Sequence, residues 1–466
     1  MERPPFDAGL LCSIASGKMA IRIISVMVYF TSGPRTRAKA CHWSRPDALE
    51  EQRGLVGMPP LWRRIPHNYR VPPRGADYKV YNVKLNSTEQ EDNFYRIKND
   101  FIDYWRKPSF KYNTIGHAMV PPAQTTWFEE RLDELGLAKD IYIDDVYKYL
   151  LAREETSMDI SRSDNTFSFN DYYRYSQILD YIKTLEATYE NSTNINLSVI
   201  EAGTTAEGRP LVYIKLTNQT PMMNKRIIII EAGINPRQWI TIPSSLNIIH
   251  RLIDSNNTRF LNDFEWIFIP VLNPDGYEYT HTNLRLWTKS RSASSNLGAI
   301  CPGVNINRNF NIDWLNSDSS SSPCSHLYGG IESFSEVESR LIQSLLEEYG
   351  NRTSAYISLQ NNGGFISYPW QYERAASGLF AQHHILGMKM IEAMVDNYEL
   401  DIASVAYGDR ASGTSTDYMR YNGVLYTFNI DVVPRGQEGV VVPREEIQII
   451  ADDVWRAVSV LAENLL

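Results

Sequence analysis

A run of four isoleucines and the polar residues behind it carry the first chemical signal in the chain. Ile227 to Ile230 is followed by a glycine-containing turn and then by Asn235, Arg237 and Gln238. Such a run is typical of a strand buried on both faces of a parallel sheet, and ligands bind beyond the carboxyl ends of these strands. A guanidinium offers a planar fork to a carboxylate, whereas amides are neutral donors and acceptors. The sequence therefore predicts a polar ligand site after this strand.

The stretch EAGINPRQW, which ends at Trp239, resembles the first zinc-ligand motif of the zinc metallocarboxypeptidases of the A and B type, roughly DAGIHAREW. Arg237 and Trp239 are kept, whereas Asn235 and Gln238 stand in place of the ligand His and Glu. The third ligand, a His in a strand motif similar to LHSY, corresponds to Gln360 in YISLQNN. The resemblance therefore implies that three neutral amides occupy the zinc positions.

A catalytic zinc takes imidazole, thiolate or carboxylate ligands and keeps one position for water. Changes around the ligands already cost roughly 10 to 100-fold in affinity or activity. We therefore expect the chain to bind no zinc and no other cofactor. The amides can hydrogen-bond to one another, and they leave no buried charge that needs a cation.

The groups that act beside the metal in the family are also changed. WTK places Thr288 where the family has the arginine that holds the developing oxyanion, and a hydroxyl brings no charge there. YTFNIDVV places Asp431 at the position of the catalytic Glu. We expect neither residue to be functional and Asp431 to pair with a cleft arginine. The family's mobile-loop tyrosine corresponds by count to Asp409, and Tyr407 reaches the same place if the loop is shifted.

The resemblance also implies a pocket for the terminal carboxylate of a peptide. In CPGVNINRNF, Asn307 and Arg308 match the pair that grips this carboxylate, and Arg237 and Arg285 match arginines of the outer cleft. Thr416 stands at the position that sets side-chain specificity, and it favours neither bulky apolar nor basic termini.

No replacement metal site is visible among the histidines. The chain has no HExxH motif, and no histidine stands at a ligand position of the family. The eight histidines are His42, His67, His117, His250, His281, His326, His383 and His384.

The element pattern predicts two folded units. Tyr78 to Leu85 alternates as a strand, capping boxes are expected at Thr88 with Glu91 and at Thr126 with Glu129, and Gly136 ends the second helix. A strand over 140–143 and a helix over 144–155 complete residues 76–152, which resemble the carboxypeptidase prodomain, a small α/β unit with an antiparallel sheet.

Residues 163–466 alternate apolar runs with helical patterns, for instance 212–216, 266–271 and 424–430 against 335–349 and 380–398. This alternation predicts one large α/β domain with a mixed, mostly parallel twisted sheet and helices on both faces. The polar segment 153–162 between the units reads as an activation linker for a trypsin-like protease, with cleavage at Arg153 or Arg162. An uncut linker is the alternative.

The compartment is predicted to be extracellular. Six N-x-[S/T] sequons, at Asn86, Asn191, Asn196, Asn218, Asn256 and Asn351, indicate a glycoprotein. By resemblance, Cys301 and Cys324 form the disulfide of the mature domain. Residues 1–75 form a leader in which 19–33 is either a signal segment or part of a disordered stretch.

Composition excludes several classes of partner. A net charge of -9 spread along the chain gives no basic face for nucleic acid. No apolar run reaches ~18 residues, so no membrane span is expected. We expect a monomer that binds peptide or protein C-termini as an inactive, secreted carboxypeptidase-like protein. The alternatives are an active zinc carboxypeptidase, and a scaffold or decoy that binds inhibitors or partner proteins.

Overall fold

The computed structural model describes residues 78–97, 99–158, 167–219, 224–254, 257–432 and 440–466. The expected leader, the segment 19–33, Arg162 and Asn256 lie outside these ranges. Arg153 lies within a helix, but its side chain is not described.

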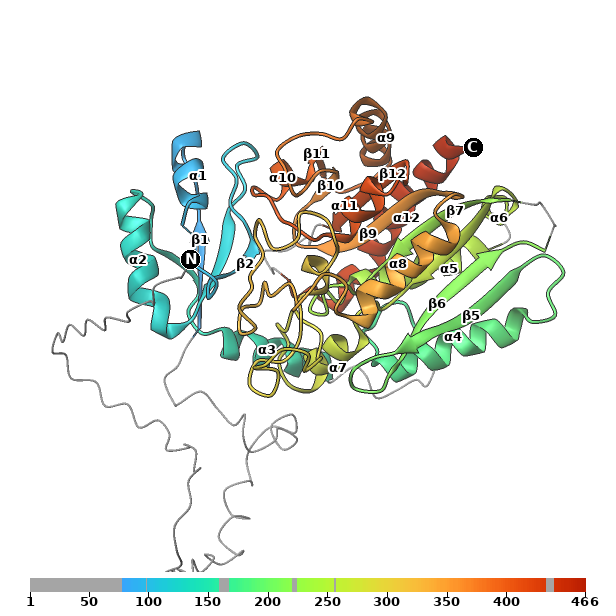
Figure 1. Cartoon of the computed structure of the whole chain (residues 1–466), viewed down its shortest axis with the longest axis horizontal. Coiled ribbons are helices and arrows are strands. Elements are labelled where there is room, and N and C mark those ends of the chain that lie inside the picture. Colours follow the sequence, from blue (N-terminus) through green and yellow to red (C-terminus); the bar gives the residue numbers. More distant parts are fainter. Residues whose placement is uncertain (1–77, 98, 159–166, 220–223, 255–256, 433–439) are drawn as a thin grey trace, which may run out of the picture. The chain divides into compact units, whose positions relative to one another are not determined.

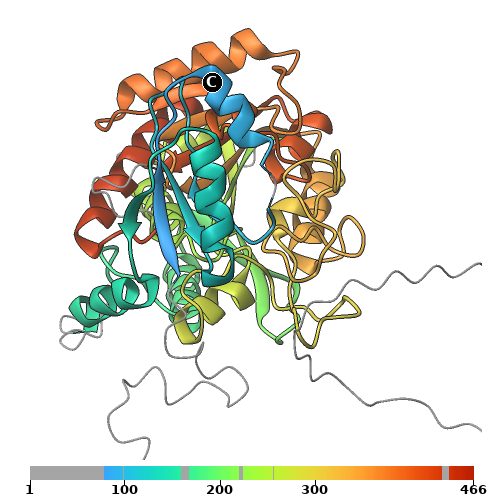
Figure 2. The same ribbon diagram turned by 90° about the vertical axis from the view of Figure 1, so that its left-hand side faces the viewer.

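The N-terminal lobe, which we define as residues 78–158, is built on a four-stranded antiparallel sheet. Its strands are β1 (Lys79–Val83), β2 (Asp103–Arg106), β3 (Gly116–Val120) and β4 (Asp140–Ile143), in the order β2-β3-β1-β4. Helices α1 (Thr88–Tyr95) and α2 (Thr125–Glu134), the latter entered through the 3-10 turn η3 (Pro122–Gln124), cover one face of the sheet (Figure 2). Phe94, Phe128 and Leu132 fill that core, and α3 (Val146–Met158) follows β4.

The helix starts of this lobe differ from the sequence prediction. The first cap is Ser87, whose side chain accepts from Gln90 N, while the Gln90 side chain accepts from Asn86 N, so the reciprocal pair lies one residue earlier than expected. No side chain caps α2, because the preceding 3-10 turn delivers its first residues already in helical conformation. Gly136 follows α2 with φ 65°, as a residue past a helix C-terminus often does.

The main lobe, residues 167–466, is built on an eight-stranded mixed sheet (Figure 1). The sheet order is β11-β10-β12-β9-β7-β8-β6-β5, and the pairs within β8-β7-β9-β12 and the pair β10-β11 are parallel. This confirms the predicted mixed, mostly parallel sheet. The strands are β5 (Asn196–Thr204), β6 (Pro210–Thr217), β7 (Arg226–Glu231), β8 (Phe264–Ile269), β9 (Thr353–Asn361), β10 (Phe365–Tyr368), β11 (Glu399–Ile402) and β12 (Tyr426–Val432).

Helices cover both faces of this sheet, so β7 has an apolar core on each side. Ile228 and Ile230 pack with α4 (Tyr175–Tyr189), α5 (Thr241–Ile253), α9 (Phe380–Ala393) and α12 (Arg444–Leu465). Ile227 and Ile229 pack with α8 (Val337–Tyr349) and α11 (Ser415–Tyr421). The short elements are α6 (Phe260–Asp263), α7 (Pro274–Thr282), η4 (Ile306–Arg308) and α10 (Ala403–Ala406).

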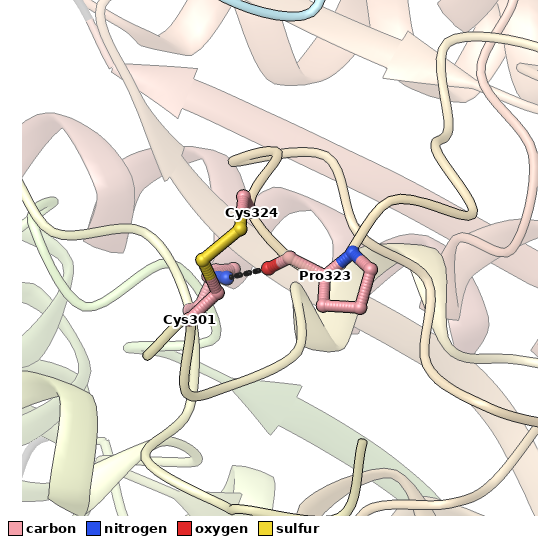
Figure 3. The surroundings of a disulfide bond; sticks show 4 residues. Cys301, Pro323 and Cys324 are labelled. Atoms are coloured by element: carbon pink, nitrogen blue, oxygen red, sulfur yellow. Dashed lines mark hydrogen bonds between the residues drawn. A yellow bond between two sulfur atoms is a disulfide. The ribbon is translucent and has the colours of Figure 1, made fainter. Parts of the chain in front are cut away.

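A disulfide joins Cys301 to Cys324 across 23 positions of the chain (Figure 3). The loop that it closes contains η4. Lys289 Nζ donates to the carbonyl oxygen of Pro323 beside the bridge at 2.7 Å. The loop is therefore tied to the main lobe at its carboxyl end.

The Ile229→Ala substitution is expected to lower the free energy of unfolding by roughly 2–5 kcal/mol, because it leaves a cavity in a core where the native side chain is 0% exposed. Ile300→Ala is the matched control, since Ile300 is 74% exposed. Urea unfolding followed by tryptophan fluorescence measures both. Equal losses in the two variants would contradict burial of Ile229 in the core between β7, α8 and α11.

Candidate functional site

The site lies where three parallel strands end. The loop after β7 carries Asn235, Arg237 and Gln238, β9 carries Gln360, and β12 carries Asp431, which pairs in register with Gln360. The loop leaves β7 through Gly233 at φ 67°, where a Cβ atom would lie 3.2 Å from the Cα atom of Val271. Glycine is therefore needed for the turn that presents the polar residues.

A cavity of about 280 Å³ lies over these strand ends. The cavity is lined by ten of the residues that the sequence places at site positions: Asn235, Arg237, Gln238, Thr288, Asn307, Arg308, Gln360, Tyr407, Asp409 and Asp431. Arg285 and Thr416 are not among the lining residues.

The three amides make hydrogen bonds with other groups and none with one another, contrary to our expectation. Asn235 Oδ1 accepts from Arg237 N at 3.4 Å, Gln238 Nε2 donates to Asn361 O at 3.1 Å, and Gln360 Nε2 donates to Ser358 Oγ at 2.8 Å. Backbone and hydroxyl groups at the ends of β7 and β9 take these bonds.

The donor chemistry of these amides does not fit zinc. Gln238 Oε1 is buried and has no hydrogen-bond partner among the described residues, yet a neutral amide oxygen is a poor substitute for imidazole or carboxylate. Within the described ranges, no group of three or more His, Cys, Asp or Glu side chains is arranged to hold a metal ion. The described residues therefore supply no ligand set suited to a catalytic zinc ion.

Asp431 is held by a backbone amide. The ion pair that we expected between Asp431 and a cleft arginine is not found among the described residues. Its Oδ1 accepts from Gly363 N at 2.7 Å. Burial raises its pKa to about 7, while the Gly363 amide, the nearby Tyr407 hydroxyl and the charge of Arg106 act in the opposite direction. Thr288, which lines the same cavity, donates through its hydroxyl to His326 O at 3.4 Å.

Arg308 has an aspartate partner from its own lobe. Its Nε donates to Asp318 O at 2.7 Å and its Nη2 to Asp318 Oδ2 at 2.8 Å, while Nη1 donates to Asn307 O. Burial acts to raise the pKa of Asp318, but the charges of Lys107 and Arg308 hold it below its usual value. Asn307 accepts from Ser415 N through Oδ1 at 3.0 Å, which fixes its amide at the cavity wall.

Arg237 has a partner from the N-terminal lobe. Its Nη1 and Nη2 donate to the two carboxylate oxygens of Asp103 in β2 at 2.5 and 3.1 Å, and the two side chains are only 7% and 10% exposed. Burial opposes ionisation, but the charges of Arg237 and then His326 hold the pKa of Asp103 below its usual value. Arg285 supports this pair from behind, because its Nη1 donates to Arg237 O and its guanidinium lies 3.8 Å over the Trp239 ring.

Further contacts place β2 against the cleft, and the described residues of both lobes belong to one compact unit. Trp105 O accepts from Asn362 Nδ2 at 3.0 Å, and Lys107 Nζ lies 3.1 Å from Asp318 Oδ1. Tyr112 donates to Asp401. The N-terminal lobe thus covers the cavity with one strand and the residues that follow it.

The structure also brings in residues that the sequence did not single out. Asn429 lines the cavity, and Thr416 lies behind it with its Oγ1 3.3 Å from Asn429 Oδ1. Asn429 lies two residues before Asp431 on the same strand face, so alternation along β12 could have indicated it. Asp318 lies in the Ser-rich run and carries no motif signal. Tyr407, which the sequence did single out, is buried beside Asp431, and burial raises the pKa of its hydroxyl.

None of the helices in the described ranges combines the length and apolar character of a membrane-spanning segment.

Residues 178–457 match the family described as zinc carboxypeptidase, and residues 81–152 match the carboxypeptidase activation peptide. The chain is 31% identical over 367 residues to carboxypeptidase B of Helicoverpa zea, covering 75% of this chain and 85% of that protein. It is 29% identical over 379 residues to carboxypeptidase A1 of Bos taurus, covering 78% and 87%. The solved carboxypeptidase A of Helicoverpa armigera superposes with a TM-score of 0.77 and 26% identity over 83% of this chain and 97% of that chain. Bovine thrombin-activatable fibrinolysis inhibitor, solved with tick carboxypeptidase inhibitor, gives a TM-score of 0.59 and 26% identity over 64% and 98%.

Asp103→Ala is expected to lower the free energy of unfolding by about 3–5 kcal/mol, because it leaves the buried Arg237 guanidinium without its counter-charge. Asp144→Ala is the matched control, since Asp144 pairs with Lys79 but its side chain is 80% exposed, and surface pairs contribute below about 1 kcal/mol. Thermal unfolding of the two variants compares them. Similar losses would show that the Arg237 pair is not buried in solution.

The Asp431→Asn variant is expected to lose less stability than the wild type when the pH is raised from 4 to 8. The folded-state pKa of about 7 lies above the unfolded value, so the folded wild type loses stability as pH rises between roughly 4 and 7. An asparagine cannot titrate, and its oxygen can still accept from Gly363 N. Unfolding midpoints over this pH range measure the effect. The exposed Asp180→Asn serves as control, and identical profiles for wild type and Asp431→Asn would contradict the shift.

Proposed function

The chain belongs to the zinc carboxypeptidase family, and we propose that it is a secreted member that binds peptide C-termini without cleaving them. The observation that carries this proposal is the composition of one cavity. Asn307 and Arg308 line it together with Asn235, Gln238 and Gln360, so groups suited to a carboxylate lie beside groups unsuited to a metal.

The proposed lack of cleavage follows from the donors in the cavity. Three neutral amides stand at the positions that the resemblance gives to the zinc ligands, and Thr288 brings no charge to an oxyanion. Asp431 keeps a carboxyl group, but a general base needs an acidified water or another activated proton within reach. A carboxyl with a pKa raised to about 7 is also partly protonated near neutral pH.

The proposed recognition of C-termini follows from the guanidinium groups. Arg308 lines the cavity with its side chain 13% exposed, and an arginine fork matches a carboxylate in two parallel hydrogen bonds. Asn307 adds a neutral amide at the same wall. Arg237 lines the cavity too, but its guanidinium is paired with Asp103 while the N-terminal lobe is in place.

Secretion and activation are part of the same proposal. The Cys301–Cys324 disulfide suits an oxidising compartment, and the sequon asparagines Asn86, Asn191, Asn196 and Asn351 are exposed. Residues 81–152 match an activation peptide. We propose that a trypsin-like protease cuts the segment 153–162 at Arg153 or Arg162 and so uncovers Arg237.

The test compares a short peptide that has a free C-terminus with its amidated form, titrated into the full chain before and after trypsin treatment. The acid form should bind at least about tenfold more tightly, and Arg308→Met should remove the difference, because charge-assisted bonds to arginine contribute roughly 1.5–3 kcal/mol. Arg259→Met is the matched control, since the Arg259 side chain is 63% exposed.

Metal analysis of the same samples separates the proposal from an active enzyme. The treated chain should contain no stoichiometric zinc and should release no terminal residue from the peptide. Stoichiometric zinc with release of that residue would establish a carboxypeptidase, and equal affinity for acid and amide forms would leave only a scaffold.

A further inference from the structure

The Arg308–Asp318 pair is unexplained by the proposed binding of carboxylates. Asp318 puts a carboxylate of the chain itself onto the guanidinium that should receive the ligand. Three of the five N–H donors of Arg308 are already used, two by Asp318 and one by Asn307 O. A ligand therefore meets a guanidinium whose charge is largely neutralised.

The position of Asp318 is held by several contacts. Its backbone adopts a φ of 40°, in the left-handed region. On one side Ser317 exchanges hydrogen bonds with Ser412, through Ser317 N to Ser412 Oγ at 2.7 Å and Ser412 N to Ser317 O at 2.8 Å. On the other side the loop is closed by Cys324. The aspartate is thus fixed against Arg308 before any ligand arrives.

The N-terminal lobe shares this aspartate. Lys107 Nζ lies 3.1 Å from Asp318 Oδ1 and 3.9 Å from Asp409 Oδ2, with 18% of the lysine side chain exposed. In the covered cleft, the cations of Lys107 and Arg308 therefore balance the carboxylates of Asp318 and Asp409. When the lobe leaves, Lys107 leaves with it, and the whole charge of Asp318 is directed at Arg308.

We propose that Asp318 is an internal counter-ion that competes with the ligand carboxylate for Arg308 and so sets the affinity of the pocket. This inference rests on the proposed function. Asp318 is a positioning residue, since it acts through Arg308 and need not contact the ligand. A consequence is that the pocket binds carboxylates weakly, and it binds them more weakly still once Lys107 has gone.

The experiment uses the full chain and the acid and amide forms of a short peptide, titrated calorimetrically into wild type and Asp318→Asn. Asparagine keeps the shape of the side chain and tolerates a positive φ, so the loop should stay folded. The variant should bind the acid form at least about tenfold more tightly, with no change for the amide form. Asp313→Asn is the matched control, because Asp313 lies in the same loop with φ 47° but bonds to Asn316 and Ser412.

Two further variants separate this effect from easier access to the cleft. Lys107→Met also breaks the contact between Asp318 and the N-terminal lobe, but it leaves Asp318 on Arg308, so the affinity for the acid form should not rise. In Asp318→Asn combined with Arg308→Met, the gain should disappear. A gain in Lys107→Met equal to that in Asp318→Asn, or a gain that survives loss of Arg308, would overturn the proposal.

The remaining outcomes distinguish this inference from the proposed function. A wild type that prefers the acid form, together with an unchanged Asp318→Asn, would refute the counter-ion role and leave the proposed function standing. If neither protein prefers the acid form, both fail. Acid preference that first emerges in Asp318→Asn would support the counter-ion role and refute the proposed recognition of C-termini by the wild type.

Discussion

The site depends on the burial of β7 on both faces of the main sheet. Ile228 and Ile230 pack in one core and Ile227 and Ile229 in the other, so a shift of one residue would exchange the two faces of the strand. β9 and β12 run parallel beside it, and their register sets Gln360 against Asp431. Apolar packing thus places the cleft, whatever polar side chains stand at the strand ends.

The two arginines of the cleft are neutralised by aspartates from different lobes. Asp103, which neutralises Arg237, comes from the N-terminal lobe, whereas Asp318, which neutralises Arg308, comes from the main lobe itself. A buried cation needs a partner because desolvation is costly. Separation of the two lobes would therefore free one arginine and leave the other paired, so the two ends of the cleft would respond differently to the same event.

Much of the fold could be predicted from the pattern of apolar residues, because buried strands such as β7 and β8 are nearly continuous apolar runs. Helix starts were less predictable, since Ser87 and Thr88 are both good capping residues and local geometry selects between them. The cleft residues of the main lobe were found through short motifs. Their partners were not, because Asp103 and Arg237 are 134 positions apart and Asp318 belongs to no motif. Thr416 was expected to line the cavity, but Asn429 lies in front of it.

The disulfide gives the two arginine–aspartate pairs different lifetimes on unfolding. Arg308 and Asp318 are ten positions apart and both lie inside the covalent ring that Cys301 and Cys324 close. The ring keeps their effective concentration high even when the surrounding sheet has opened. Arg237 and Asp103 have no such tether, and they meet only in the assembled chain. As the fold loosens, Arg237 is therefore expected to lose its counter-charge before Arg308, whose aspartate is only ten positions away along the chain.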